Sequence, residues 1–115
     1  AIPKVHLGTL LKETLIEMTR KGLGMSAIVD REGRIVGIYT DGDLRRTLDG
    51  ALDLHATQVD AVMTRHPITV RAGILAAEAL LVMEERKINA LLVVDEAGLL
   101  VGALNMHDLL RAGVV

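Results

Sequence analysis

The chain has 115 residues, 50% of them hydrophobic and only Tyr39 aromatic, which predicts a small aliphatic core and surplus apolar surface that favours a homodimer or higher homo-oligomer. A net charge of −2, a pI of about 6.1 and the shortage of stacking rings argue against nucleic acid and anionic membranes as partners. The absence of cysteine excludes disulfides and thiolate metal sites, and the longest apolar run, residues 72–83, is too short to span a bilayer, so we expect a soluble cytoplasmic protein.

The first half of the chain predicts a strand, a helix, two strands and a second helix. A short extended entry over residues 4–7 precedes a helix in which Leu11, Leu15 and Met18 recur at i, i+4 and i+7. Two apolar strands follow, joined by a turn over residues 30–33 that starts with Asp and ends with Gly. The second of these strands runs directly into a polar turn and a short helix.

This junction places Gly37, Thr40 and Asp43 at the spacing G-x-x-T-x-x-D, with Asp41 and Gly42 between the last two. Free backbone N–H groups at a helix start, together with the Thr40 hydroxyl, can hold a phosphate. The Asp43 carboxylate can accept two hydrogen bonds from a ribose diol. The alternative is that Thr40, Asp41 or Asp43 only caps the helix.

Two basic residues, Arg45 and Arg46, follow in the first turn of the expected helix. Cations near a helix N-terminus oppose the helix dipole, whereas a bound phosphate would favour them, so both are candidate ligand-binding residues. The alternative is two solvated charges. Arg46 has a further alternative, a role in packing, because the same residue recurs in the second half as Arg111.

Residues 51–67 are expected to form a linker between the two halves, with a short helix around Val59–Met63 before Pro67. His66 lies at the end of this linker. An imidazole there is a candidate site residue, and a plain connecting residue is the simpler interpretation.

The second half repeats the first at an offset of 65 residues without a gap, and 14 of 42 positions are identical between residues 5–46 and 70–111. A period this long indicates a duplicated supersecondary unit rather than a solenoid repeat. We therefore predict an α/β (α+β) fold of two β-α-β-β-α repeats, over residues 1–50 and 68–115. A pseudo-twofold axis should relate them, with ligand clefts at the seam.

The second junction departs from the first, because Asn105 stands in place of Thr40 and His107 lies beside Asp108. The amide can still form hydrogen bonds, but the ligand site at the second junction should prefer a different ligand from the site at the first. The His107 imidazole can donate a hydrogen bond to a phosphate or carboxylate, more strongly when protonated. The alternative for His107 is a surface histidine at a helix start.

The sequence offers no catalytic constellation. Ser26 is the only serine and is expected in mid-strand, and Asp41 and Asp43 alternate around a glycine instead of facing a common substrate. No grouping of His, Asp and Glu has the spacing of a metal site. We therefore predict that this chain catalyses no reaction and requires no metal or cofactor.

Two β-α-β-β-α copies, with this motif at the second strand–helix junction, resemble a tandem pair of CBS domains (a Bateman module) over nearly the whole chain. The stretches TRKGLGMSAIVD, GIYTDGDLRR and MHDLLRAGVV further resemble the C-terminal half of D-arabinose-5-phosphate isomerases. That resemblance implies a host that interconverts ribulose 5-phosphate and arabinose 5-phosphate on the Kdo route to lipopolysaccharide. It also implies that the chemistry belongs to an N-terminal sugar-isomerase (SIS) domain outside this chain.

The resemblance to CBS pairs implies an adenosine nucleotide, AMP or ATP, in the clefts between repeats. In that family the hydroxyl residue and the Asp of the motif contact phosphate and ribose. Carried over, this names Thr40 and Asp43 in the first copy and Asp108 in the second. His66 precedes the second entry strand, which borders a cleft in such pairs.

The implied function is allosteric regulation, in which a bound nucleotide biases the tilt of the repeats and the tilt is passed to the isomerase domain. A second candidate ligand is CMP-Kdo, the nucleotide-sugar end product, whose ribose could meet Asp43 and whose phosphate and carboxylate could meet Arg45, Arg46 or His107. Two alternatives are a purely structural module that joins subunits, and the CBS pair of another host such as a transporter or a dehydrogenase.

Overall fold

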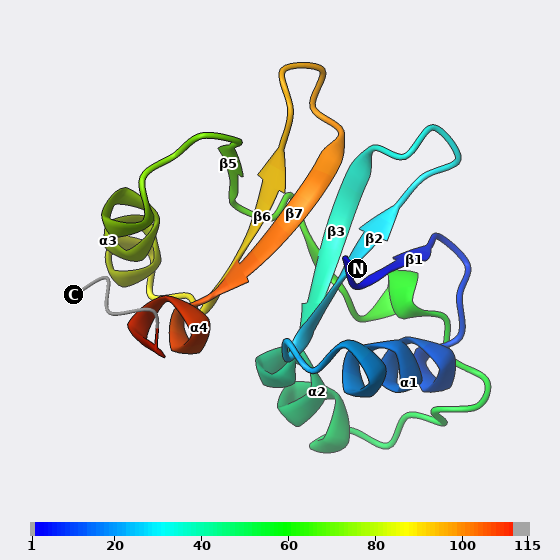
Figure 1. Ribbon diagram of the computed structural model, residues 1–115. Coiled ribbons are helices and arrows are strands. Elements are labelled where there is room, and N and C mark those ends of the chain that lie inside the picture. Colours follow the sequence, from blue (N-terminus) through cyan, green and yellow to red (C-terminus); the bar gives the residue numbers. More distant parts are fainter. Residues whose placement is uncertain (1, 112–115) are drawn as a thin grey trace. The chain divides into compact units, whose positions relative to one another are not determined.

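The computed structural model describes residues 2–111, with the side chain of Arg111 left out, and divides into two compact units, residues 1–67 and 68–115. Figure 1 shows that each unit combines a small β-sheet with two α-helices. Each unit contains the predicted β-α-β-β-α order, which confirms the predicted fold class.

The first unit contains a four-stranded sheet in the order β1-β2-β3-β4. Its elements are β1 (Lys4–His6), α1 (Leu11–Lys21), β2 (Met25–Val29), β3 (Ile35–Thr40), α2 (Asp41–Leu48), the 3-10 turn η1 (Val59–Ala61) and β4 (Thr64–Arg65). β1 runs parallel to β2, and the other neighbours are antiparallel.

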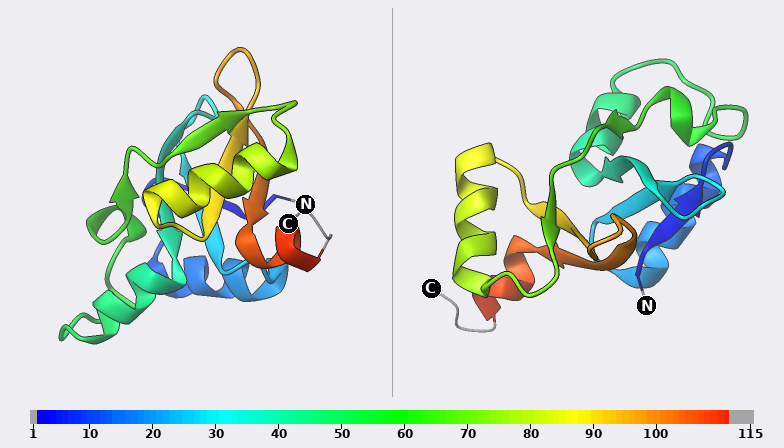
Figure 2. Two further views of the ribbon diagram at one scale, coloured as in Figure 1. Left: turned by 90° about the vertical axis from the view of Figure 1, so that its left-hand side faces the viewer. Right: turned by 90° about the horizontal axis from the view of Figure 1, so that it is seen from above.

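The second unit contains a three-stranded sheet in the order β5-β6-β7. Its elements are β5 (Thr69–Arg71), α3 (Ala76–Arg86), β6 (Ala90–Val94), β7 (Leu100–Asn105) and α4 (Met106–Arg111). Both helices lie on the same side of β6 and β7 (Figure 2, right-hand view).

The duplication extends to the pairing register of the strands. Lys4 pairs with Ala27 in the first sheet, and Thr69 pairs with Leu92 in the second. The β2–β3 ladder shifts register between Ile28 and Val29, and the β6–β7 ladder shifts at the equivalent residues, 93 and 94. The two repeats therefore have the same backbone conformation down to this irregularity, at which the strand bends.

Each unit has its own hydrophobic core, in which apolar helix residues pack against the sheet. The buried residues of the first core are Leu11, Met18, Ile28, Tyr39, Val59 and Met63. Those of the second are Ala79, Leu80, Met83, Leu91 and Leu109. The cores are aliphatic apart from Tyr39, as predicted from the composition.

The segment that we expected to be a linker packs in part against the first unit. Val59 is fully buried, its N–H donates to the Thr9 carbonyl, and the Leu11 N–H donates to the Thr57 carbonyl. The helix expected around Val59–Met63 is a three-residue 3-10 turn. The strand β4 follows it and was not predicted. Tertiary packing determines the secondary structure of this segment. A two-residue strand is too short to show a periodic pattern in the sequence.

Among residues 2–111, the helices α1 and α3 have 11 residues each, and no helix is long and apolar enough to cross a membrane.

Candidate functional site

The first candidate site begins where β3 becomes α2. Thr40 ends β3 in an extended conformation and is the N-cap of α2. Its Oγ1 accepts a hydrogen bond from the Asp43 backbone N–H at 3.2 Å, and Asp43 Oδ2 accepts one from the Thr40 backbone N–H at 2.9 Å. These reciprocal bonds form a capping box, which satisfies N–H groups that a helix start otherwise leaves unpaired.

The Asp43 side chain is 4% exposed, and its carboxylate has further partners. Oδ2 also accepts from the Thr40 hydroxyl at 3.1 Å. Oδ1 accepts from Arg46 Nη2 at 2.5 Å and from the Thr64 hydroxyl at 2.9 Å. An ionised carboxylate offers about four acceptor positions, so each of them has a partner within the first unit. The Arg46 guanidinium supplies the balancing charge that a buried carboxylate needs.

This geometry gives Thr40 and Asp43 the helix-capping role that the sequence left open as the alternative. The hydroxyl and carboxylate expected to face a ligand hydrogen-bond to the protein itself in this conformation. Arg46 pairs with Asp43, but its side chain is 71% exposed, so its charge stays at the surface. Arg45 is also exposed.

A chain of hydroxyl groups ties α2 to β3 beside Asp43. The buried Tyr39 hydroxyl lies 2.8 Å from Thr47 Oγ1, which donates to the Asp43 carbonyl at 2.9 Å. Because the Thr47 hydrogen is used there, Tyr39 is the donor in its own bond. Burial is the largest effect on this phenol and raises the pKa of Tyr39 above its ordinary value of 10.0. Tyr39 is therefore neutral at physiological pH.

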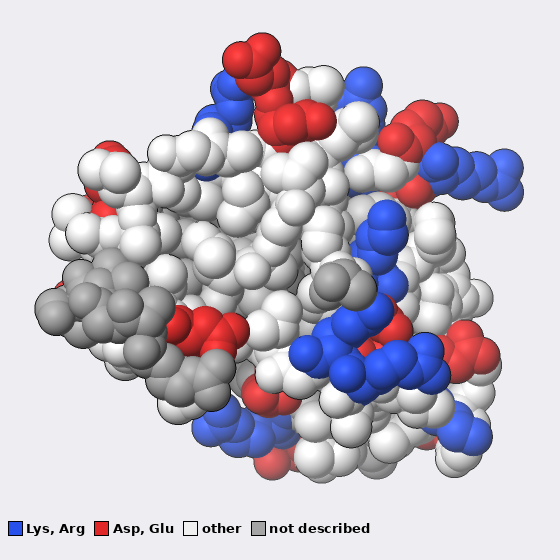
Figure 3. Space-filling view, viewed as in Figure 1, with Lys and Arg blue, Asp and Glu red and all other residues white. Residues whose placement is uncertain are grey.

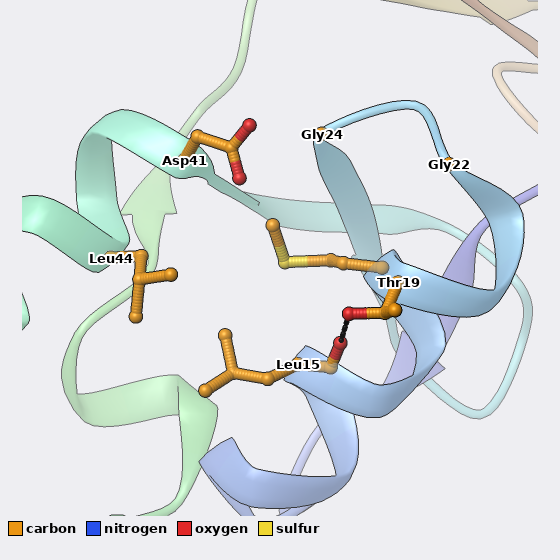
Figure 4. Close-up of a pocket in the computed structure, with 7 residues that line it drawn as sticks. Leu15, Thr19, Gly22, Gly24, Asp41 and Leu44 are labelled. Carbon is orange, nitrogen blue, oxygen red and sulfur yellow. Dashed lines mark hydrogen bonds between the residues drawn. The ribbon is translucent and has the colours of Figure 1, made fainter.

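Asp41 lies apart from this network, at the rim of a cavity of about 470 Å³ between α1 and α2. Figure 4 shows Leu15 and Leu44 pointing into the cavity and the Asp41 carboxylate near Gly24. A Cβ on Gly24 would lie 2.7 Å from Asp41 Oδ2, and the backbone there has φ +70°, so both space and conformation favour glycine. The cavity walls are mainly apolar.

Gly42 has looser surroundings than Gly24. A Cβ at position 42 would lie 3.6 Å from Thr40 Oγ1 and 3.8 Å from Arg46 Nη1, which are ordinary contacts. Sterics within the unit therefore do not require glycine at position 42.

The second candidate site is the start of α4. Asn105 Oδ1 accepts a hydrogen bond from the Asp108 backbone N–H at 2.7 Å, so the amide replaces the Thr40 hydroxyl as the helix-capping acceptor. His107 is exposed and Asp108 is half-buried. His66, in the other unit, is exposed directly after β4 and has a left-handed backbone with φ 54°.

Most of the predicted residues thus fall into two groups, one at the β3–α2 junction and one at the β7–α4 junction, whereas His66 lies after β4, apart from both. In the described part of the chain, no group of three or more His, Asp and Glu residues could hold a metal ion. On the face shown in Figure 3, Lys and Arg side chains lie among Asp and Glu side chains, and much of the surface is uncharged.

Sequence reasoning missed Thr64, whose hydroxyl binds Asp43 from 21 residues away. It also missed the reason for Gly37. A Cβ on Gly37 would lie 2.5 Å from Met63 Sδ and 3.0 Å from the Thr64 carbonyl oxygen, so the close pairing of β4 with β3 favours glycine at this position. No local pattern marks Thr64, because its role depends on where the chain returns.

The sequence model of the CBS domain matches residues 1–50 and 59–115. The chain belongs to the CBS domain family. The predicted resemblance to a tandem CBS pair is confirmed.

Curated relatives of this CBS pair include two named arabinose 5-phosphate isomerase KdsD. The one from Pseudomonas aeruginosa is 60% identical over 99% of the chain, and the one from Escherichia coli K12 is 51% identical over the same share. The chain spans 35% and 34% of their lengths, respectively. It corresponds to the CBS part of such a protein, as predicted, and about two thirds of each relative lies outside the match.

Solved structures of CBS proteins share this fold. A protein with CBS domains from Burkholderia ambifaria superposes with a TM-score of 0.87 at 28% identity, over 99% of this chain and 83% of that one. PAE2072 from Pyrobaculum aerophilum, solved with AMP, has a TM-score of 0.85 at 23% identity, over 99% and 92%. MJ0100, solved with 5-methylthioadenosine and S-adenosylmethionine, has a TM-score of 0.87 at 23% identity, over 99% and 89%.

Proposed function

We propose that this chain is the nucleotide-sensing regulatory pair of a cytoplasmic sugar-phosphate isomerase that converts ribulose 5-phosphate to arabinose 5-phosphate on the Kdo route to lipopolysaccharide. The observation that carries the proposal is the 60% identity over 99% of the chain to a protein named arabinose 5-phosphate isomerase. The catalytic domain of such a host, linked to this chain, would be its regulatory partner.

The ligand class follows from the fold and the candidate residues together. Other CBS pairs of the same fold have been solved with AMP or with S-adenosylmethionine, which share an adenosine group. At the first site, a ribose hydroxyl would reach the Asp43 carboxylate by displacing one of its present partners, and the exposed cations Arg45 and Arg46 would meet the phosphates. We therefore propose AMP or ATP as the ligand, with CMP-Kdo as the feedback alternative.

The second candidate site, at the β7–α4 junction, should prefer a different ligand from the first. Asn105 presents an amide where the first site has a hydroxyl, and the exposed His107 imidazole can donate a hydrogen bond to a ligand phosphate or carboxylate. Asp108 keeps a carboxylate in the position equivalent to Asp43. Regulation requires only that a ligand bind two arrangements of the pair with different affinities, and coupling of about 1–3 kcal/mol is ordinary for such modules.

Calorimetric titration of the unaltered chain with AMP, ATP and CMP-Kdo tests this function. We expect saturable binding of at least one nucleotide and a loss of affinity of about 10-fold or more in Asp43→Asn, because a charged acceptor becomes a neutral amide. Asp30→Asn is the matched control, since Asp30 Oδ1 accepts from the backbone N–H groups of Glu32 and Arg34 in a distant turn. The absence of heat with all three nucleotides would contradict nucleotide sensing.

A structural role in joining subunits is the second candidate, because large apolar side chains are exposed in both units. They are Leu7, Ile16, Leu48, Leu52, Leu75, Leu81, Leu99, Val101 and Leu110. Burial of such a set would stabilise a homodimer. Sedimentation velocity over a range of concentrations measures the association, and a melting temperature that no nucleotide shifts would identify the role as purely structural.

A further inference from the structure

One carboxylate oxygen joins the G-x-x-T-x-x-D motif of the first unit to the strand that leads out of this unit. Asp43 Oδ1 accepts from the Thr64 hydroxyl at 2.9 Å, and Thr64 is the first residue of β4. Among the described residues, Thr64 is the one donor to this carboxylate that comes from outside residues 40–46. The bond therefore connects two segments that are distant in sequence.

β4 is held to the first unit by few interactions. It has two residues, which pair with Gly37 and Ile38 of β3. The Met63 side chain packs over Gly37, and the Thr64 hydroxyl reaches Asp43. A strand this short is marginal without side-chain support. The second unit begins at residue 68, three residues after β4 ends.

The two oxygens of Asp43 differ in how easily their partners can leave. The partners of Oδ2 are the backbone N–H and the hydroxyl of Thr40, which belong to the capping box, so displacing them would disrupt the start of α2. The partners of Oδ1 are two side chains, Arg46 and Thr64, both on exposed residues. A ligand hydroxyl can replace the Thr64 hydroxyl like for like and leave the Arg46 ion pair in place.

We propose that a ligand hydroxyl and the Thr64 hydroxyl compete for Asp43 Oδ1, so that ligand binding releases β4 and loosens the connection to the second unit. This inference rests on the proposed nucleotide binding and adds the route by which binding is transmitted. By linkage, an effect of the ligand on β4 implies an equal effect of β4 docking on ligand affinity. A variant that cannot form the Thr64 bond should bind the ligand more tightly.

The test is Thr64→Val, which keeps the branched shape and removes the hydroxyl. We expect this variant to bind the nucleotide found for the unaltered chain about 3- to 10-fold more tightly, the range that one such hydrogen bond represents. Thr9→Val is the matched control, because it removes a hydroxyl that donates to the His6 carbonyl at 2.7 Å, away from Asp43. Its affinity should not change. Unchanged or weaker binding by Thr64→Val would overturn the competition.

Hydrogen exchange of the β3 and β4 amides gives a readout that does not depend on affinity. Saturating nucleotide should speed exchange at residues 64–65 in the unaltered chain, and Thr64→Val should show that faster exchange without ligand. Asp43→Asn should also speed it without ligand, because the weaker acceptor holds Thr64 less well. Unchanged exchange at β4 in Asp43→Asn would overturn the role of Asp43 in docking this strand.

The failure of this inference differs from the failure of the proposed function. If the unaltered chain binds nucleotide but Thr64→Val binds it no more tightly, nucleotide sensing stands and the competition is wrong. If only Thr64→Val binds nucleotide, the competition is supported, and the Thr64 hydroxyl of the unaltered chain then blocks the ligand from Asp43 completely. If neither protein binds any nucleotide, both proposals are wrong.

Discussion

The two polar junctions of this chain, residues 37–46 and 102–111, occupy equivalent positions in the two repeats and have different surroundings. In the first, β3 has β4 on its outer edge and Asp43 is closed in by Thr64. In the described part of the second unit, β7 is the edge strand, and Asn105 caps α4 through its amide. Thr64, which lies outside the repeated residues 5–46, therefore determines which partners the Asp43 carboxylate has.

In the first unit, the carboxylate of the motif residue Asp43 therefore has two roles: it caps α2 and it holds β4 through Thr64. The capping box uses one oxygen of Asp43, and the other oxygen accepts from Arg46 and Thr64, the second of which a ligand would displace under our proposal. A motif read without its surroundings predicts the ligand role, whereas the structure shows the capping and docking roles that the same atoms perform without one.

The largest expected contrast is between Gly37 and its repeat equivalent, Gly102. Gly37→Ala should destabilise the first unit by about 2 kcal/mol, because its Cβ would overlap Met63 and press on the Thr64 backbone. Gly102→Ala should be neutral or slightly stabilising, since the nearest atom, Val93 Cβ, would lie at 3.4 Å and alanine suits a strand better than glycine. Denaturant unfolding followed by unit-resolved hydrogen exchange measures both. Equal losses in the two variants would show that β4 does not restrict Gly37.

A smaller contrast is pH dependence, which only the first unit should show at this position, because Leu104 is the equivalent of Tyr39. Burial raises the folded-state pKa of Tyr39 above 10.0, so the neutral phenol stabilises the fold below about pH 10, and that stability is lost as the pH rises through the folded pKa. Tyr39→Phe should lose about 1 kcal/mol at pH 8 with its hydrogen bond to Thr47, and should then decline less steeply above pH 10. Thermal melts from pH 8 to 11 test this expectation, which parallel curves would refute.

The smallest contrast is at the ends of α1 and α3, where Gly22 and Lys87 occupy equivalent left-handed positions with φ 70° and 56°. Glycine adopts this conformation without a side-chain penalty, whereas lysine does not. Lys87→Gly should therefore stabilise the second unit by up to about 1 kcal/mol, and Gly22→Lys should destabilise the first by a similar amount. Calorimetry measures the melting temperatures of the two variants. Changes of the same sign in both would contradict the shared cap geometry of α1 and α3.

The duplication, the β-α-β-β-α order and the apolar faces could be predicted from the amino-acid sequence, because these depend on residue periodicity and on glycines placed within a few positions of the elements they end. The sequence also predicted ligand-binding residues, most of them at the two strand–helix junctions, and these stay predictions. The tertiary structure alone decided that β4 exists, that Gly37 lies under Met63, and that Thr64 closes the Asp43 carboxylate. Those contacts join segments more than twenty residues apart through side chains with no local pattern, so only the folded path of the chain brings their atoms within hydrogen-bonding distance.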